Sequence, residues 1–228
     1  MNLFKMSLYN MDRRAVFSTL LLSAAMIAGG LPFRVHGDDS RSIALPQPQM
    51  DGGIPLMRAI KARKSSREFA DKPIPQQQLS NLLWAAFGVN RDDGKRTAPS
   101  AHNRQEIDIY VALRDGLFRY DAVNNALQPI LERDIRGLTG KQDFPAHAAL
   151  NLVYVADFSR VKNVPRKEAM EVAAISTGAI VQNVYLYCAS EGLATVVRGW
   201  IDKKALAKAM GLRDDQYIFV AQSVGYSP

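Results

Sequence analysis

The stretch from Arg166 to Glu191 most constrains what this chain can fold into. It contains no proline, is rich in alanine and closes at Gly192, so it predicts one long helix with a glycine cap. Apolar residues occur nearly all round this helix, and a helix of that kind belongs in a protein core. We therefore expect a long, buried central helix around which the other elements pack.

The other expected elements are short helices and strands in mixed order. Helical spacing of apolar residues predicts helices over residues 54–63, 75–87, 123–135 and 202–210, with Pro129 an irregularity inside the third. Apolar runs predict strands over residues 106–113, 117–121, 150–156, 193–197 and 217–224, and Asp115-Gly116 signals a hairpin turn. Because strands and helices do not alternate regularly, an α+β fold around a mostly antiparallel sheet is favoured.

The N-terminal segment has the pattern of an export signal. Arg13 and Arg14 precede an apolar run, Ser18 to Gly30, that is short for a permanent membrane span. The paired arginines followed by Ala-Val-Phe resemble a twin-arginine signal. We expect residues 1–37 to be this signal, residues 38–53 a linker, and residues 54–228 the folded domain of an exported, periplasmic protein. An uncleaved anchor and a general secretory signal are the alternatives.

Charge and cysteine content exclude several classes of function. Residues 1–37 hold four of the 29 Lys and Arg residues and one of the 22 Asp and Glu residues, so the rest has a net charge of +4. That excess gathers near residues 58–67 and 91–104 without an aromatic-interleaved stripe, which favours a local anionic ligand over nucleic acid. The single cysteine, Cys188, excludes an intrachain disulfide, and the three histidines are scattered, so no metal site is expected.

A basic run follows the first expected helix of the domain. Arg63-Lys64-Ser65-Ser66-Arg67 places three cations and two hydroxyl groups together, just before Pro73. In an extended chain, period two puts Arg63, Ser65 and Arg67 on one face, where guanidinium groups and a hydroxyl can bind a phosphate. The alternative is a solvated basic run that stabilises the end of the helix.

Two later stretches complete a pattern. Pro99-Ser100-Ala101-His102-Asn103-Arg104-Gln105 lies in a polar loop, and the strand over 193–197 ends at Arg198-Gly199. Alone, the loop reads as an ordinary turn and Gly199 as a strand terminator. Together with the basic run and the long helix, they resemble the FMN-dependent nitroreductase family over residues 54–226. They look most like its peptide-azoline dehydrogenase branch, which forms thiazoles and oxazoles.

The resemblance implies a nitroreductase-like fold and a homodimer with FMN at the interface. Arg63 and Ser65 would bind the phosphate, and Arg67 would lie near the negative charge of the reduced ring. The loop containing Asn103 would reach the partner's flavin, and the turn ending at Gly199 would bring backbone N–H groups to the ring. The implied cofactor-binding residues are Arg63, Lys64, Ser65, Arg67, Pro99, Ser100, Ala101, Asn103, Val197, Arg198 and Gly199.

The implied function is an FMN-dependent oxidoreductase that passes hydride or electrons through the flavin N5. NAD(P)H is the candidate electron donor, and the substrate is a small molecule or a peptide. Azoline oxidation in modified peptides and flavin-binding electron transfer without a substrate pocket are the alternatives. No catalytic side chain is assigned, and the roles of His102 and Arg198 stay open.

The chain departs from the family pattern at three places, and one of them is Arg198, which stands at a position that is often acidic or small in relatives. Glu106-Ile107 stands where many relatives have Pro-Trp. The chain also ends at Pro228, before the basic phosphate contacts that longer members carry, and Lys95 or Arg96 are candidate substitutes.

Overall fold

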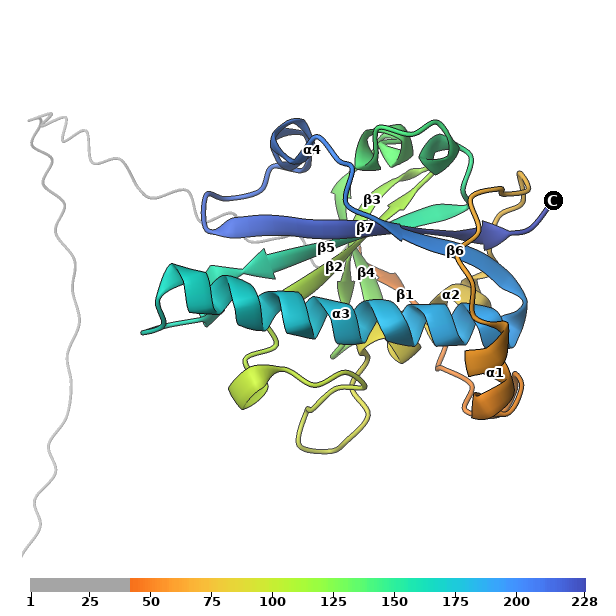
Figure 1. Ribbon diagram of the computed structural model, residues 1–228, viewed down its shortest axis with the longest axis horizontal. Helices are drawn as coiled ribbons and strands as arrows, with labels where there is room; N and C mark the ends of the chain where they lie inside the picture. The colour runs from red at the N-terminus through yellow and green to blue at the C-terminus, as the bar shows by residue number, and fades with distance from the viewer. Residues whose placement is uncertain (1–41) are drawn as a thin grey trace, which may run out of the picture. The chain divides into compact units, whose positions relative to one another are not determined.

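A sheet of seven strands forms the centre of the described part of the chain, residues 42–228. In this computed structural model the strand order is β1-β4-β3-β2-β5-β7-β6, and neighbouring strands are antiparallel (Figure 1). The signal expected over residues 1–37 lies outside the described residues. The strands are β1 (Ile43–Ala44), β2 (Ile107–Leu113), β3 (Gly116–Asp121), β4 (Ala126–Leu131), β5 (Leu150–Asp157), β6 (Leu193–Arg198) and β7 (Gln216–Tyr226).

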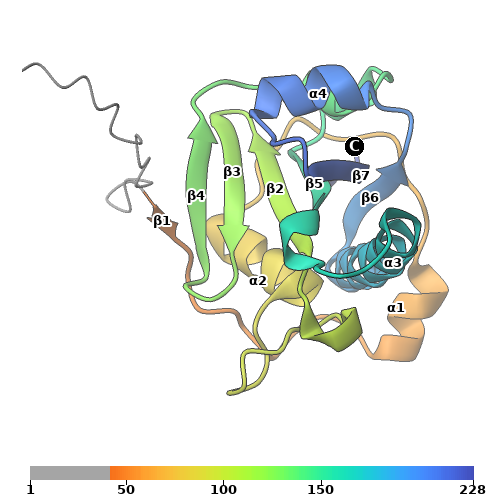
Figure 2. The ribbon, with the colours of Figure 1, turned by 90° about the vertical axis from the view of Figure 1, so that its left-hand side faces the viewer.

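Helices cover both faces of this sheet. Figure 2 shows α2 and α3 against one face and α4 over the other. One apolar cluster includes Leu82 of α2 and Ile180 of α3, and a second cluster includes Leu206 of α4. The α-helices of the described residues are α1 (Leu56–Ala62), α2 (Gln76–Phe87), α3 (Arg166–Glu191) and α4 (Lys203–Met210). The predicted α+β fold with a long central helix is confirmed.

The long helix α3 has the predicted bounds but is not buried all round. It ends at Gly192, whose φ of 70° is left-handed, as expected for a glycine cap. Its buried face repeats every four residues and includes Ile180, Val184 and Cys188. On the opposite face Ile175 is 75% exposed, because the sheet covers only one side of the helix. Within residues 42–228, α3 is also the one helix long and apolar enough to cross a membrane.

The helix predicted over residues 123–135 is wrong, because this segment forms a turn and the strand β4. The carboxylate of Asp121 accepts hydrogen bonds from the backbone N–H groups of Val123 and Asn124, at 3.0 and 3.1 Å. This turn sends the chain back antiparallel to β3. Pro129 fits the strand because β1 pairs only with Ala126 and Leu127, which leaves Pro129 on a free edge.

The described part of the expected linker is held against the domain. Ile43 and Ala44 form β1 on the edge of β4, and Leu45 is buried. The carbonyl of Pro46 accepts hydrogen bonds from Ser80 Oγ and Asn125 Nδ2. The described part of the linker therefore forms the edge of the sheet and is part of the folded domain.

Glu106 is a buried carboxylate at the start of β2. It is fully buried, and no donor within residues 42–228 hydrogen-bonds either carboxylate oxygen. Burying a carboxylate without a partner costs free energy, so this departure from the family pattern should reduce stability.

We expect Glu106→Met to raise the free energy of unfolding by about 1–3 kcal/mol, because it removes the unpaired oxygens and keeps the unbranched shape. Urea denaturation measures the change. The control is Glu171→Met on the exposed side of α3, which should stay within about 0.5 kcal/mol of the parent chain. A loss of stability in Glu106→Met would show that the carboxylate makes a favourable interaction.

Candidate functional site

The basic run lies beside β6, the edge strand of the sheet, and the residues after it reach the end of β7. α1 ends at Arg63, whose ψ of 121° turns the chain into an extended conformation. The N–H of Ser66 donates to the carbonyl of Thr195 in β6, and the N–H of Ala70 donates to the carbonyl of Tyr226 in β7, both at 2.9 Å. The chain thus leaves α1 in an extended direction at Arg63 and is hydrogen-bonded to the edge of the sheet at Ser66.

Tyr185 joins the basic run to the end of β6. This α3 residue is buried, and its hydroxyl lies 2.9 Å from Ser65 Oγ and accepts a hydrogen bond of 2.9 Å from the N–H of Val197. The guanidinium carbon of Arg63 lies 5.3 Å from the centre of the Tyr185 ring. The first and third sequence motifs are thus brought together. Sequence reasoning missed Tyr185, because nothing separates it from the other apolar positions of a core helix.

The surface at this junction is positive and rich in hydrogen-bond donors. Lys64 and Arg67 are exposed and Arg63 is half-buried. Among residues 42–228, none of these three cations pairs with a carboxylate. A Cβ built on Gly199 meets no atom within 4 Å, so the turn after β6 borders open space. These residues fit an anionic cofactor that carries a phosphate group.

Close packing fixes the position of the basic run. A Cβ on Gly225 would lie only 3.0 Å from the Phe69 ring and 3.2 Å from the backbone nitrogen of Ala149. The Phe69 ring also packs against Phe144, with ring centres 6.0 Å apart. The end of the run is therefore held against β7, and the absence of a side chain at Gly225 allows it.

The third motif differs from its expected role at two residues. The N–H of Val197 is not available to a ligand, because it donates to the Tyr185 hydroxyl. The side chain of Arg198 is buried in the interior and does not face the open space. Arg198 pairs with Ala221, and its N–H faces β7 because that of the preceding residue Val197 faces away, so the N–H of Gly199 is the expected donor left for a cofactor ring.

Arg198 forms a buried polar cluster without an acid. Its guanidinium group donates to the Thr139 carbonyl, and to Asn151 Oδ1 and Ser223 Oγ at 2.5 and 3.0 Å. Burial lowers its pKa to about 10. Because Thr139 belongs to the segment between β4 and β5, Arg198 ties that segment to the sheet. Its role, open from the sequence, is structural.

The second motif lies apart from the other two in both views (Figures 1 and 2). It contains a short 3₁₀ helix, Ala101–Asn103, and left-handed backbone at His102 and Asn103, with φ of 54° and 53°. Both of these residues are exposed, and Pro99 is exposed while Ser100 and Ala101 are half-buried. Within the described chain the structure therefore does not unite this loop with the basic run.

Gln105 holds the loop in shape and is a second residue that sequence reasoning passed over. Its N–H donates to Ser100 Oγ at 3.0 Å, and its amide donates to Asn103 Oδ1 at 2.9 Å. Its side-chain oxygen accepts from Arg96 Nε at 2.7 Å, and its carbonyl accepts from Arg160 Nη1 at 2.7 Å. The motif signalled a loop, but not that one glutamine would organise it.

Comparison with known proteins identifies the family. The sequence profile described as the Nitroreductase family matches residues 60–226. The chain belongs to the nitroreductase family. A Methanocaldococcus jannaschii protein, provisionally named a nitroreductase, is 31% identical over 171 residues, which cover 71% of this chain and 85% of that protein. As a member of this family, the chain is an oxidoreductase, as the sequence analysis predicted.

Solved structures extend the likeness. The crystal structure of a provisionally named nitroreductase from Ralstonia eutropha JMP134 is 46% identical, with a TM-score of 0.79 over 82% of this chain and 90% of that chain. A chain of the Escherichia coli microcin synthetase complex has a TM-score of 0.63 at 19% identity, covering 89% of this chain and 85% of that one. At that identity the second likeness shows the nitroreductase fold alone.

We expect Tyr185→Phe to lower the free energy of unfolding by about 1–2 kcal/mol, because it leaves the Val197 N–H and Ser65 without their shared partner. Tyr187→Phe is the matched control on the same helix, since its hydroxyl makes a longer bond of 3.3 Å to the Gln78 carbonyl. It should cost about 0.5 kcal/mol or less. Equal losses in the two variants, measured by urea denaturation, would contradict the linking role of Tyr185.

Proposed function

We propose that this protein is an FMN-dependent oxidoreductase that holds its cofactor at the junction of the basic run and β6. The Tyr185 hydroxyl carries the proposal, because it joins Ser65 to Val197 beside three cations that have no carboxylate partner within residues 42–228. FMN, when bound, supplies the hydride or electron transfer. The protein supplies position and charge.

The residues of the junction divide this work. Arg63 and Ser65 would bind the phosphate through charge-assisted hydrogen bonds, with Lys64 adding positive charge. Arg67, further along the run, would stabilise negative charge on the ring. The open space beside Gly199 leaves room for the ring next to the end of β6. Of the two further candidate phosphate contacts, Arg96 instead binds Gln105, and Lys95 pairs with Asp93.

A second copy of the chain would complete the site. Leu56 and Met57 of α1 are 62% and 75% exposed, and Ile175 of α3 is 75% exposed on the face that bears Gly178. Exposed apolar surface on two adjacent helices suits a protein partner. We propose a homodimer in which this face is buried and the loop containing Asn103 reaches the partner's flavin. Ile175→Glu should yield monomers that lose FMN, measured by light scattering and flavin fluorescence.

Reduction of the bound flavin tests the catalytic proposal. Protein loaded with FMN should bleach near 450 nm when NADPH or NADH is added anaerobically, and recover its colour with a nitroaromatic acceptor. Bound FMN that neither nicotinamide reduces would favour a partner-fed or peptide-oxidising role. The fold likeness to the microcin synthetase chain makes an azoline-containing peptide the next substrate to test.

Export is part of the proposal and rests on the sequence of residues 1–37. Cell fractionation of the full chain should find it in the periplasm, and Arg13→Lys combined with Arg14→Lys should retain it in the cytoplasm. Cytoplasmic location of the unaltered chain would exclude a twin-arginine signal.

A further inference from the structure

A second positive site surrounds the loop that contains Gln105. A cleft of about 490 Å³ opens where this loop meets β2, β3 and β4. It is lined by four arginines, Arg96, Arg104, Arg119 and Arg160, and by two acids, Asp108 and Asp121. Four guanidinium groups against two carboxylates give the lining a net charge of +2.

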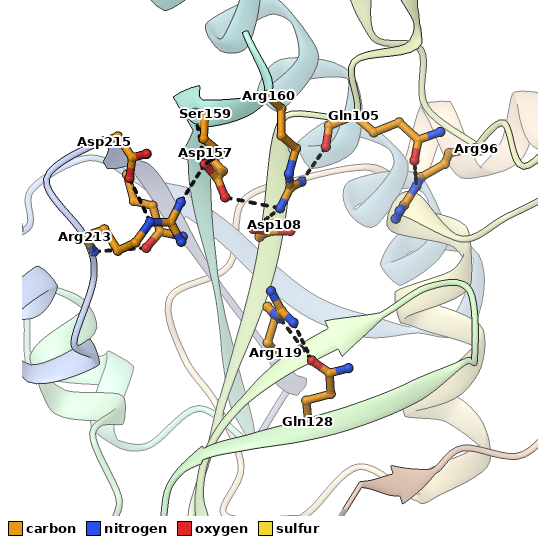
Figure 3. Close-up of polar contacts among 11 residues, drawn as sticks. Arg96, Gln105, Asp108, Arg119, Gln128, Asp157, Ser159, Arg160, Arg213 and Asp215 are labelled. Atoms are coloured by element: carbon orange, nitrogen blue, oxygen red, sulfur yellow. Dashed lines mark hydrogen bonds and ion pairs between the residues drawn. The ribbon is translucent and has the colours of Figure 1, made fainter. Parts of the chain in front are cut away.

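Within residues 42–228, three of the four arginines, Arg96, Arg104 and Arg119, have no acidic partner. Arg160 is neutralised by Asp108 at 2.6 Å and Asp157 at 3.5 Å. Arg119 instead donates through Nε and Nη2 to the neutral Gln128 Oε1, at 3.2 and 2.5 Å. Figure 3 shows Arg119 and Arg160 extending toward the same space from different elements.

Arg96 is the second arginine without an acid. It donates to Gln105 Oε1 (Figure 3). It also donates to the Phe87 carbonyl at 3.2 Å, and its guanidinium carbon lies 4.7 Å from the centre of the Phe87 ring. Within residues 42–228, neither Arg96 nor Arg119 forms an ion pair. Burial lowers the pKa of Arg96, and the attraction of Asp108 and Asp121 offsets this effect only in part.

The acid beside Arg119 is already occupied. The carboxylate of Asp121 accepts hydrogen bonds from Val123 N, Asn124 N and Asn124 Nδ2. It also accepts one from Gln128 Nε2 at 3.1 Å. Asp121 therefore serves the turn before β4, and the unused donors of Arg119 can serve a ligand.

The loop that supplies Arg96 and Arg104 is held in a strained shape. His102, Asn103 and Gln105 are non-glycine residues with φ of 54°, 53° and 49°. Left-handed backbone at such residues costs free energy and persists where surrounding contacts impose it. Here the contacts come from the cleft itself, since Arg96 and Arg160 both bond Gln105. The cleft is thus a preorganised arrangement of cations.

We propose that this cleft binds a small dianion, a phosphate ester or a dicarboxylate, distinct from the cofactor at the basic run. Arg96, Arg104 and Arg119, which line the cleft and form no ion pair within residues 42–228, supply its positive charge. The volume lies within the range of small-molecule pockets, and paired guanidinium groups match the geometry of phosphate and carboxylate oxygens. Asn103 lines the cleft as well, so a ligand here would lie next to the loop proposed to meet the partner's flavin.

Calorimetric titration of the full chain with inorganic pyrophosphate, and separately with succinate, tests the proposal. The titrations are run with FMN saturating and again without it. We expect saturable binding of at least one probe, one per chain, in both conditions, and the stronger probe identifies the anion class. Arg119→Gln should weaken it about ten- to a hundredfold, the range for loss of one charge-assisted hydrogen bond.

Arg133→Gln is the matched control, because Arg133 is exposed and lies outside the cleft lining. It should leave binding unchanged, and thermal melts should show that both variants are folded. Absence of binding by both probes would overturn the proposal. Binding that survives Arg119→Gln but is lost in Arg63→Ala would overturn it too, because the anion would then occupy the basic run. A chain that takes up no FMN but binds the probe through Arg119 would refute the proposed function and leave this inference standing.

Discussion

We expect Arg63→Ala to weaken FMN binding about ten- to a hundredfold. Arg63 has no carboxylate partner within residues 42–228 and lies over the Tyr185 ring, so its guanidinium group is oriented with donors to spare. A charge-assisted hydrogen bond to a phosphate contributes about 1.5–3 kcal/mol, which corresponds to that loss of affinity. Quenching of FMN fluorescence during titration measures the dissociation constant.

The control for this prediction is Arg58→Ala, on the exposed surface of the same helix. It removes the same charge from nearby and should change FMN affinity less than about threefold, because exposed charges are screened by salt. Equal effects of the two substitutions would mean that only the general charge of this end of the molecule matters. If Arg63→Ala leaves the affinity for FMN unchanged, the basic run is only a solvated segment at the end of a helix and not a cofactor site.

Arg198→Met lowers the free energy of unfolding by about 2–4 kcal/mol, the largest stability effect we expect. Methionine keeps the apolar stem but leaves the Thr139 carbonyl without its buried donor and removes one of the two donors to Asn151 Oδ1, the other being Ser223 Oγ. The segment between β4 and β5 loses its tie to the sheet. In a chain of this size each kcal/mol shifts Tm by about 2–4 °C, so calorimetry should show a fall of roughly 4–16 °C.

Arg213→Met is the contrasting control. Arg213 pairs with Asp157 at 2.8 Å and Asp215 at 2.9 Å, but its side chain is 55% exposed. Exposed ion pairs contribute little, so this variant should lose less than about 1 kcal/mol. Replacing Arg213, which pairs with two acids, should therefore lower the free energy of unfolding less than replacing Arg198, which pairs with none within residues 42–228. A reversed order would contradict the structural role assigned to Arg198.

Periodic patterns allowed much of the fold to be predicted. The bounds of α3 follow from its proline-free apolar sequence and Gly192, and the strands at 150–156 and 217–224 were visible as apolar runs. β4 was missed because its apolar residues also suit helical spacing, whereas the Asp121 turn that decides the matter is a local hydrogen-bond pattern. Pro129 was the one signal against a helix. The two-residue β1 is too short for any period to reveal.

The candidate site likewise has features that the sequence predicted and features that it did not. The motifs marked where an anion could bind, but the residues that assemble it are set by tertiary contacts. Tyr185 reads as one more core residue until β6 and the basic run are placed on either side of it. From the sequence alone Arg198 is a candidate ligand residue, whereas in the structure its side chain is buried in the protein interior. No sequence period carries such information, because these partners are far apart along the chain.

FMN uptake by the purified full chain tests the central claim most directly. The protein is incubated with FMN, freed of unbound cofactor by gel filtration, and its flavin absorbance is compared with its concentration, with circular dichroism as proof of folding. We predict one FMN per chain, with uptake reduced in Arg63→Ala and unchanged in Arg58→Ala. A folded protein that emerges colourless would contradict it.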